Sequence, residues 1–215
     1  MKKLILIFLV FTGMQSYAQG WKTVKLDSAV SFQLPPGFKK TGSDTSKSFS
    51  ASTTFGTILI FKAQDNSIVT PDIERDKHLA DYYSDYIERV QTSTSDGKIT
   101  LEKDTLLGEL KVKDFTLEID TGSGKQFRKF RVLHANNATY TFEFLFDEMH
   151  KDYAAEESDK FFNSIKVNEN LAPADQFNAT ASETSGTNFY LIGGAVILVV
   201  AFVVFLFVRK KKVVS

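Results

Sequence analysis

The amino-acid sequence predicts an α+β domain in which helices pack on the faces of an antiparallel β-sheet, followed by one C-terminal transmembrane helix. Three observations lead to this fold class. Many short segments alternate apolar and polar residues, which is typical of half-buried strands. Two segments have the apolar spacing of amphipathic helices, one after Thr70 and one over Lys151–Ile165. Between them, four strand-like segments follow one another without an intervening helix, as in an antiparallel meander.

Composition supports a folded chain and excludes several kinds of chemistry. The 215 residues are 43% hydrophobic and 24% charged, which is typical of a globular protein and unlike a disordered one. The sequence contains no cysteine, so disulfides, thiolate nucleophiles and cysteine-ligated metal sites are excluded. The three histidines, His78, His134 and His150, lie far apart. No metal site and no cofactor is therefore predicted.

The N-terminus has the pattern of a secretory signal peptide. Lys2 and Lys3 precede the apolar run 4–11, and Ser16-Tyr17-Ala18 provides small residues at the −3 and −1 positions of a cleavage site. The apolar run is too short to span a bilayer. We therefore expect residues 1–18 to be a cleaved signal peptide rather than an uncleaved anchor.

The C-terminal region has the pattern of a membrane anchor. Phe189 to Val208 forms a stretch of 20 residues without a charge, long enough as a helix to cross about 30 Å of hydrocarbon. The following residues 209–215 begin with Arg209, Lys210, Lys211 and Lys212, a cationic cluster that marks the cytoplasmic side. The prediction is a single-pass protein of the cytoplasmic membrane, with its N-terminal domain outside and its C-terminus inside. A cleaved sorting signal is the alternative, but no Leu-Pro-x-Thr-Gly motif is present.

Charge and composition also divide the exported region. Six of the 26 basic residues lie in the two terminal segments, which leaves 20 basic against 26 acidic residues outside the membrane. This acidic balance argues against a nucleic-acid partner, because phosphate binding needs a basic patch. Residues 168–188 contain only Leu171 and Phe177 as large apolar side chains, so we expect a flexible tether there. The predicted extracytoplasmic domain is 19–167.

The first half of the domain is predicted to contain strands followed by a helix. Alternation indicates strands through Val24 and Leu26 and through Val30–Leu34, and another strand is expected near Lys47–Thr53. Phe55–Phe61 is apolar on both faces, as expected of a central strand. Thr70, Pro71 and Asp72 have the order of a capped helix start, and the expected apolar face of that helix is Ile73, Ala80, Tyr83, Ile87 and Val90.

The second half is predicted to be the meander and a closing helix. The four strands are expected at Lys98–Leu107, Glu109–Ile119, Lys125–His134 and Ala138–Phe146, with Gly or Asn at the turns between them. In the last strand four aromatic residues share one face, which we expect to be buried: Tyr140, Phe142, Phe144 and Phe146. The closing helix presents a stripe that can cover this face, formed by Ala154, Ser158, Phe161 and Ile165.

Two of these segments, together with the order of elements, resemble a known group. The opening Val30-Ser31-Phe32-Gln33-Leu34-Pro35-Pro36-Gly37-Phe38 and the closing Phe161-Phe162-Asn163-Ser164-Ile165-Lys166 flank a long helix and a meander, and the whole is similar to the PsbP and Mog1-like group. The resemblance covers about Trp21 to Val167 and implies an α/β/α sandwich on an antiparallel sheet. It also implies a non-enzymatic assembly or binding factor, without a set of functional residues to carry over.

Three local patterns could carry chemistry, and each has a simpler interpretation. Asp120–Lys125 resembles a phosphate loop, but a strand rather than a helix follows it, so a hairpin turn is favoured. The tyrosines Tyr82, Tyr83 and Tyr86 could line a ligand site or form a core stripe. The junction Asp147–Asp152 gathers carboxylates and His150, where a cation or an acid/base pair could form, although acids are common at the start of helices.

These patterns leave two hypotheses for function. The preferred one is a non-catalytic binding or assembly module, held at the outer face of the membrane and bound to a protein partner in or near it. The alternative is a small metal-dependent or hydrolytic enzyme that uses the Asp147–Asp152 junction. No catalytic, cofactor-binding or metal-binding residue is assigned.

Overall fold

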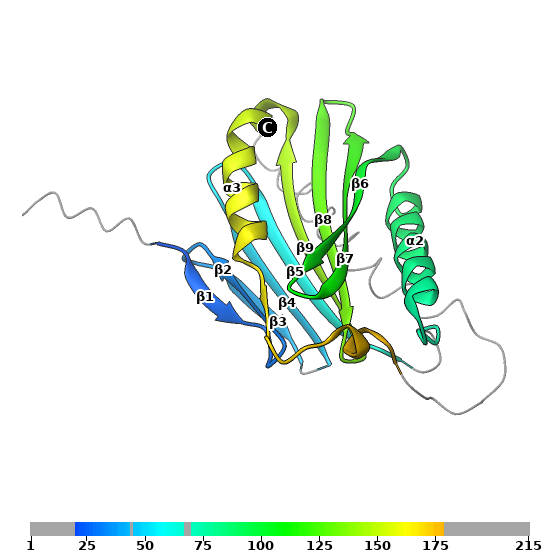
Figure 1. Cartoon of the computed structure of the whole chain (residues 1–215). Helices are drawn as coiled ribbons and strands as arrows, with labels where there is room; N and C mark the ends of the chain where they lie inside the picture. The colour runs from blue at the N-terminus through cyan, green and yellow to red at the C-terminus, as the bar shows by residue number, and fades with distance from the viewer. Residues whose placement is uncertain (1–19, 44, 67–69, 179–215) are drawn as a thin grey trace, which may run out of the picture.

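The computed structural model describes residues 20–43, 45–66 and 70–178, and these residues form an α+β fold with antiparallel sheets and two α-helices (Figure 1). The larger sheet has seven strands in the order β3-β4-β5-β9-β8-β7-β6. The smaller sheet has the order β1-β2-β10. The expected fold class is confirmed for this part of the chain.

The larger sheet contains the predicted meander. Consecutive strands β6 to β9 pair antiparallel with their neighbours, and β5 lies between β4 and β9, as expected for a strand that is apolar on both faces. Asn136 and Asn137 form the β8–β9 turn with positive φ angles of 52° and 53°. The strands are β3 (Lys39–Gly42), β4 (Ser46–Ser52), β5 (Thr57–Gln64), β6 (Gly97–Leu107), β7 (Leu110–Asp120), β8 (Lys125–Ala135) and β9 (Ala138–Asp147).

The smaller sheet was not anticipated from the sequence. It consists of β1 (Lys22–Lys25), β2 (Val30–Leu34) and the short β10 (Lys166–Val167). Both outer strands pair antiparallel with β2. The two predicted N-terminal strands therefore exist, but they form a separate layer instead of joining the main sheet.

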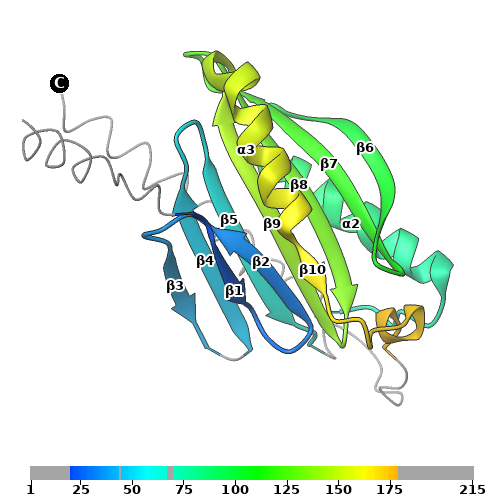
Figure 2. The ribbon, with the colours of Figure 1, turned by 60° about the vertical axis from the view of Figure 1, so that its left-hand side comes forward.

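The two helices lie on opposite faces of the large sheet (Figure 2). Helix α3 (Lys151–Ser164), preceded by the 3-10 turn η1 (Glu148–His150), shares its face with the small sheet. Helix α2 (Asp76–Thr92) covers the meander from the other side. Strand β9 is covered on both sides. Eight of its ten residues are buried, one is half-buried and only the last is exposed.

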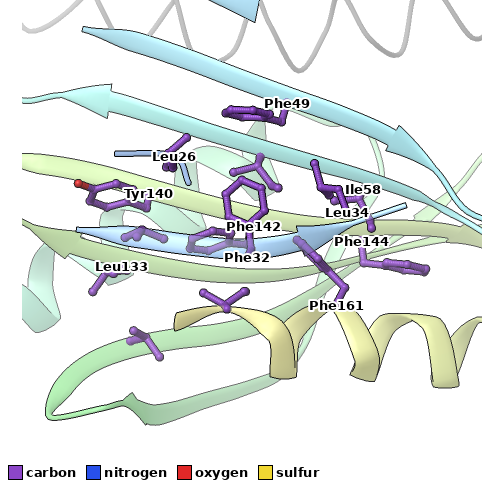
Figure 3. Close-up of a cluster of buried hydrophobic side chains, with 14 of the residues drawn as sticks. Leu26, Phe32, Leu34, Phe49, Ile58, Leu133, Tyr140, Phe142, Phe144 and Phe161 are labelled. Atoms are coloured by element: carbon purple, nitrogen blue, oxygen red, sulfur yellow. The ribbon is translucent and has the colours of Figure 1, made fainter. Parts of the chain in front are cut away.

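The α3 face contains the larger apolar core, and the predicted aromatic stripe lies in it. Phe142 packs edge-on against Phe32 of β2, with ring centroids 6.1 Å apart, and lies 6.5 Å from the ring of Phe161 in α3. Figure 3 shows these side chains gathered between the sheet, strand β2 and helix α3. The expected stripe of α3 is confirmed, since Ala154, Ser158, Phe161 and Ile165 are all buried.

Helix α2 begins later than predicted. Its first residue is Asp76, and no side chain caps it. The backbone N–H of Ile73 instead donates to the side chain of Asn178, and the N–H of Asn178 donates to the carbonyl of Ile73 at 3.0 Å. This pairing keeps residues 70–75 out of the helix. The expected apolar face is also corrected at Ala80, which is exposed, whereas Leu79 is buried.

The prediction of a flexible tether from Asn168 onward is wrong for residues 168–178. This segment contains the 3-10 turn η2 (Pro173–Gln176, orange in Figure 1) and packs against the domain. Gln176 is only 1% exposed, and its side chain bonds to the backbone of Lys111 and His134. The segment is held by hydrogen bonds of the buried Gln176 side chain rather than by large apolar residues. Its low content of large apolar residues was therefore a misleading sign of flexibility. The folded domain therefore extends past Val167.

The predicted signal peptide 1–18, the rest of the tether and the predicted span Phe189 to Val208 lie outside the described residues. None of the helices among the described residues has the length and hydropathy that a transmembrane span requires.

Candidate functional site: a groove between helix α2 and strand β6

A groove of about 520 Å³ lies between the N-terminal half of α2 and the strands β6 and β7. Its floor is formed by two buried side chains of α2, Leu79 and Tyr83. Val112 of β7 also lines the groove, but its side chain lies in the core on the α3 face of the sheet. Leu106 of β6 stands on the rim and is 63% exposed. Ala80 leaves room on the helix side because its side chain is a single methyl group. The groove can therefore accommodate an apolar side chain of a ligand above its floor.

Charged side chains at the rim are arranged in pairs. Lys111 Nζ lies 2.7 Å from Asp76 Oδ2 across the groove. Lys113 Nζ lies 2.7 Å from Asp104 Oδ1 and 3.1 Å from Glu102 Oε1. Acidic and basic groups are thus balanced here, so the groove does not favour a strongly charged ligand. The Lys111–Asp76 pair is exposed on both sides, and such pairs contribute little to stability, typically below about 1 kcal/mol. The Lys113 side chain is only 11% exposed and is held more firmly.

Strand β6 is an edge of the large sheet, and a bulge interrupts it. Pairing with β7 shifts register between Thr100 and Lys103, and Leu101 has a φ of 55°. A leucine in the left-handed region is strained, and Leu101 is 77% exposed. Bulges and charged side chains protect an edge from indiscriminate strand pairing. The bulge leaves two regularly paired stretches, Gly97–Thr100 and Lys103–Leu107, and the second lies beside the groove.

The three tyrosines of α2 are anchored beneath the helix. Tyr82 and Tyr86 share hydrogen bonds with the hydroxyls of Thr139 and Thr141, at 2.6 and 2.7 Å. Tyr83 donates to the carbonyl of Lys111 at 3.0 Å. Burial raises the pKa of Tyr86 to about 12 and also raises those of Tyr82 and Tyr83, so all three remain neutral. All three tyrosines are buried in the core under α2, as expected of a core stripe, and Tyr83 also lines the groove.

A buried ion pair lies farther along the same sheet face. Arg128 of β8 and Glu143 of β9 are 2% and 0% exposed, and the Arg128 Nε donates to Glu143 Oε1. The Glu143 carboxylate raises the pKa of Arg128 against the opposing effect of burial. Among the described residues, neither Arg128 Nη1 nor Glu143 Oε2 has a hydrogen-bond partner. The two opposite charges are therefore enclosed under α2 and held in contact with each other.

The Asp147–Asp152 junction has a different geometry from the one its composition suggested. Asp147, Glu148 and Asp152 are exposed, and Asp147 Oδ1 lies 3.5 Å from Gln126 Nε2. The His150 ring lies 5.8 Å from the ring of Phe55. Within the described residues, no group of three His, Asp or Glu side chains is placed to hold a metal ion. The structure therefore provides no converging donor set at this junction.

The glycine-containing loop after β7 is a hairpin turn, as favoured from the sequence. The Thr121 N–H donates to the carbonyl of Gly124 at 3.0 Å, and β8 begins at Lys125. Gly122 has a φ of 73°, which glycine adopts without strain. The loop joins the antiparallel strands β7 and β8 and does not lead into a helix.

The groove itself was not predicted from the sequence. Its lining comes from α2, β6 and β7, and only the antiparallel register brings these segments together. The signal that was available is the pair of leucines, Leu101 and Leu106, in a segment otherwise rich in charge. These leucines indicate an exposed apolar surface only when the strand is known to lie at the edge of the sheet.

This arrangement of a seven-stranded antiparallel sheet, one helix on each face and a small N-terminal sheet is a PsbP-like fold. A solved structure of cyanobacterial PsbP, CyanoP from Synechocystis, superposes with a TM-score of 0.52 at 12% identity, covering 72% of this chain and 96% of that one. The resemblance noted in the sequence is thereby confirmed at the level of the fold.

Two further solved structures show weaker similarity. LpqN, described as involved in cell envelope biogenesis of Mycobacterium tuberculosis, gives a TM-score of 0.41 at 10% identity over 69% of this chain and 91% of that one. A Mog1 variant gives 0.41 at 10% identity over 70% and 97%. No protein-family model and no curated protein matches the sequence. The conclusion about the fold therefore rests on the comparison with PsbP.

Proposed function

We propose that this protein is a non-catalytic binding module outside the cytoplasm, held at the membrane by residues 189–208, and that it binds a segment of a partner protein in the groove between α2 and β6. The observation that carries the proposal is the floor of Leu79 and Tyr83 beside the exposed Leu106 on an edge strand. An extended segment can pair with a sheet edge while inserting one side chain into a neighbouring pocket.

The chemistry of the groove indicates what kind of segment fits. The floor offers apolar contact, and the paired rim charges give no net attraction for a highly charged ligand. We therefore expect a short extended stretch with one large aliphatic or aromatic side chain, flanked by polar residues of either sign. Full burial of such a side chain contributes about 1.5–3 kcal/mol.

The experiment compares variants of the full-length chain by cross-linking in intact cells and purification of the cross-linked complex. Ala80→Trp fills the groove from an exposed position, and we expect loss of a stoichiometric partner. Leu101→Asp changes an exposed leucine of β6 that lies outside the groove, and it should retain the partner. The proposal is wrong if both variants bind alike.

Membrane attachment requires a separate test. A chain ending at Asn188 should appear in the soluble exported fraction, whereas the complete chain should resist extraction from membranes by alkaline carbonate. Intact mass of the mature protein distinguishes a permanent anchor from a cleaved sorting tail, because only cleavage removes Arg209–Ser215.

The enzyme hypothesis is tested by the combined variant Asp147→Asn, Glu148→Gln and His150→Gln. If any turnover is found and this variant abolishes it, the proposal of a non-catalytic module must be abandoned. Unchanged binding and cellular phenotype in the same variant would remove the junction from consideration.

A further inference from the structure

A buried histidine connects three separate parts of the chain. His134 of β8 is 0% exposed. Its Nδ1 lies 2.8 Å from the carbonyl oxygen of Gln176 in η2. Its Nε2 lies 2.9 Å from Asp65 Oδ2, just after β5. The ring therefore bridges the C-terminal segment 168–178 and the connection that leads to α2.

Both groups that face the ring nitrogens are hydrogen-bond acceptors, and this determines how many protons the site must hold. A carbonyl oxygen can only accept, so Nδ1 must carry a proton. A neutral ring would then present the lone pair of Nε2 to the Asp65 carboxylate, which is repulsive at 2.9 Å. The observed contact is favourable only when a second proton lies between Nε2 and Asp65, whether it belongs to the ring or to the carboxyl group.

The other groups around His134 do not supply this proton. Tyr82 packs edge-on against the ring, with centroids 5.4 Å apart, and shares its hydroxyl with Thr139. The Tyr83 hydroxyl accepts from the backbone N–H of His134 and donates to the Lys111 carbonyl. The Lys111 ammonium is paired with Asp76, and the Asp175 carboxylate accepts from the N–H of Ala172. Asp65 is the one carboxylate among these groups that contacts the ring.

We infer that a proton shared by His134 and Asp65 clasps the C-terminal segment 168–178 to the domain, and that loss of this proton as the pH rises loosens the segment. Removing the proton places a lone pair against a carboxylate in a buried site, which favours separation of the ring from Asp65. The ring then no longer holds both contacts, and its bond to the Gln176 carbonyl is weakened.

Loosening would reach the groove described above. Gln176 Nε2 donates to the Lys111 carbonyl at 2.8 Å, and Gln176 Oε1 accepts from the Lys111 N–H at 2.7 Å. Lys111 and Tyr83 both line the groove. The clasp thus lies directly behind the groove, although its existence does not depend on what the groove binds.

Hydrogen exchange of the full-length protein in detergent, followed by mass spectrometry between pH 5.5 and 8.5, tests the clasp. After correction for intrinsic exchange rates, we expect opening of 168–178 to increase by up to about tenfold per pH unit. This slope applies over the pH range in which the closed segment still holds the shared proton and the opened segment has released it. Peptides from α3 should show no such increase. A flat pH profile for 168–178 in the wild-type protein overturns the inference.

The matched variant is Asp65→Asn. Its amide can donate to a neutral Nε2, so the contact is retained without the extra proton, and the increase in opening of 168–178 with rising pH should disappear. Unchanged protection of α3 peptides shows that the variant is folded. A pH dependence in Asp65→Asn equal to that of the wild type would assign the effect to another group and contradict the clasp.

The protonation state itself is measured by the ring ¹⁵N shifts of His134. At pH 5.5 we expect the signature of two protonated nitrogens or of one proton shared with Asp65. A ring with a free Nε2 lone pair while 168–178 remains protected would refute the proposed proton count.

Discussion

The two faces of the large sheet are built from different chemistry. The α3 face has an apolar centre formed by Phe32, Phe142 and Phe161. Its ion pairs, Lys62 with Asp27 and Arg131 with Asp114, are partly exposed. The α2 face buries hydroxyls, an imidazole and an ion pair, and its helix is fixed by tyrosine hydroxyls bonded to Thr139 and Thr141. Apolar contacts tolerate small displacements, whereas a hydroxyl pair at 2.6 Å fixes one alignment. We conclude that the α3 face supplies most of the stability and that the α2 face fixes the position of its helix.

Truncation on the apolar face should have the largest effect. Phe142→Ala removes a fully buried ring from contact with Phe32 and Phe161. We expect the free energy of unfolding to fall by about 3–5 kcal/mol, from lost burial and from the cavity left behind. Denaturant titration measures this. Met149→Ala, at an exposed position, is the control and should change stability by less than about 0.5 kcal/mol. A loss below about 1 kcal/mol for Phe142→Ala would contradict the assignment of stability to this face.

Breaking the ion pair on the polar face should cost nearly as much. Glu143→Leu leaves the Arg128 guanidinium buried without its counter-charge, and we expect a loss of about 3 kcal/mol. The double variant Arg128→Met with Glu143→Leu removes both charges and should recover most of this loss, because a buried pair adds little over an apolar replacement. If the double variant is as unstable as the single one, the ion pair itself stabilises the fold. The α2 face would then contribute to stability as well as to the position of its helix.

Removing one hydroxyl from the α2 face should have a moderate effect. Tyr86→Phe leaves the buried hydroxyl of Thr141 without the partner it has at 2.7 Å, so we expect a loss of about 1–2 kcal/mol. Adding Thr141→Val removes the orphaned hydroxyl and should restore part of the loss. Tyr153→Phe, on an exposed ring, should leave the midpoint of thermal unfolding unchanged. Equal effects of Tyr86→Phe and Tyr153→Phe would show that the hydroxyl pairs are not what fixes α2.

Acid should reveal a smaller polar contribution on the apolar face. Burial acts to raise the pKa of Asp27, but hydrogen bonds from Lys62, Tyr140 and the N–H groups of Ala29 and Val30 outweigh it and hold the pKa below its ordinary value. Because the folded pKa is the lower one, this stabilisation is present above about pH 4 and is lost as the pH falls through the folded value. Asp27→Asn should therefore flatten the acid limb of stability against pH. An unchanged acid limb would exclude Asp27 as its source.

The sequence allowed the apolar face to be predicted better than the polar one. Alternation in Ala138–Phe146 identified the buried aromatic stripe, because burial of apolar residues leaves a period-two pattern. The ion pair of Arg128 and Glu143 left no such pattern, since the two residues meet only through the register of β8 and β9. Sequence reasoning detects burial of apolar surface, and it does not detect polar groups that are buried because they are paired.

The missed elements have the same physical origin. Strand β3 has four exposed residues, and it is held by backbone pairing with β4 alone. The start of α2 was placed too early because Thr70, Pro71 and Asp72 suit a helix start, while Ile73 bonds to a residue more than a hundred positions away. The candidate groove was missed because its lining comes from three segments, α2, β6 and β7, that only the fold brings together. Backbone hydrogen bonds that leave no apolar pattern, local at β3 and non-local at Ile73, account for these differences.

The docking of residues 168–178 also determines how mechanical load would enter the domain. A pull on the chain beyond Asn178 is transmitted first to its paired bonds with Ile73 and then through Gln176 to β7 and β8. The small β10 and helix α3 lie behind this attachment and are shielded from the pull. Tension would therefore detach the short C-terminal segment from the domain before it strained the aromatic core. The segment would thus limit the force that reaches the rest of the domain.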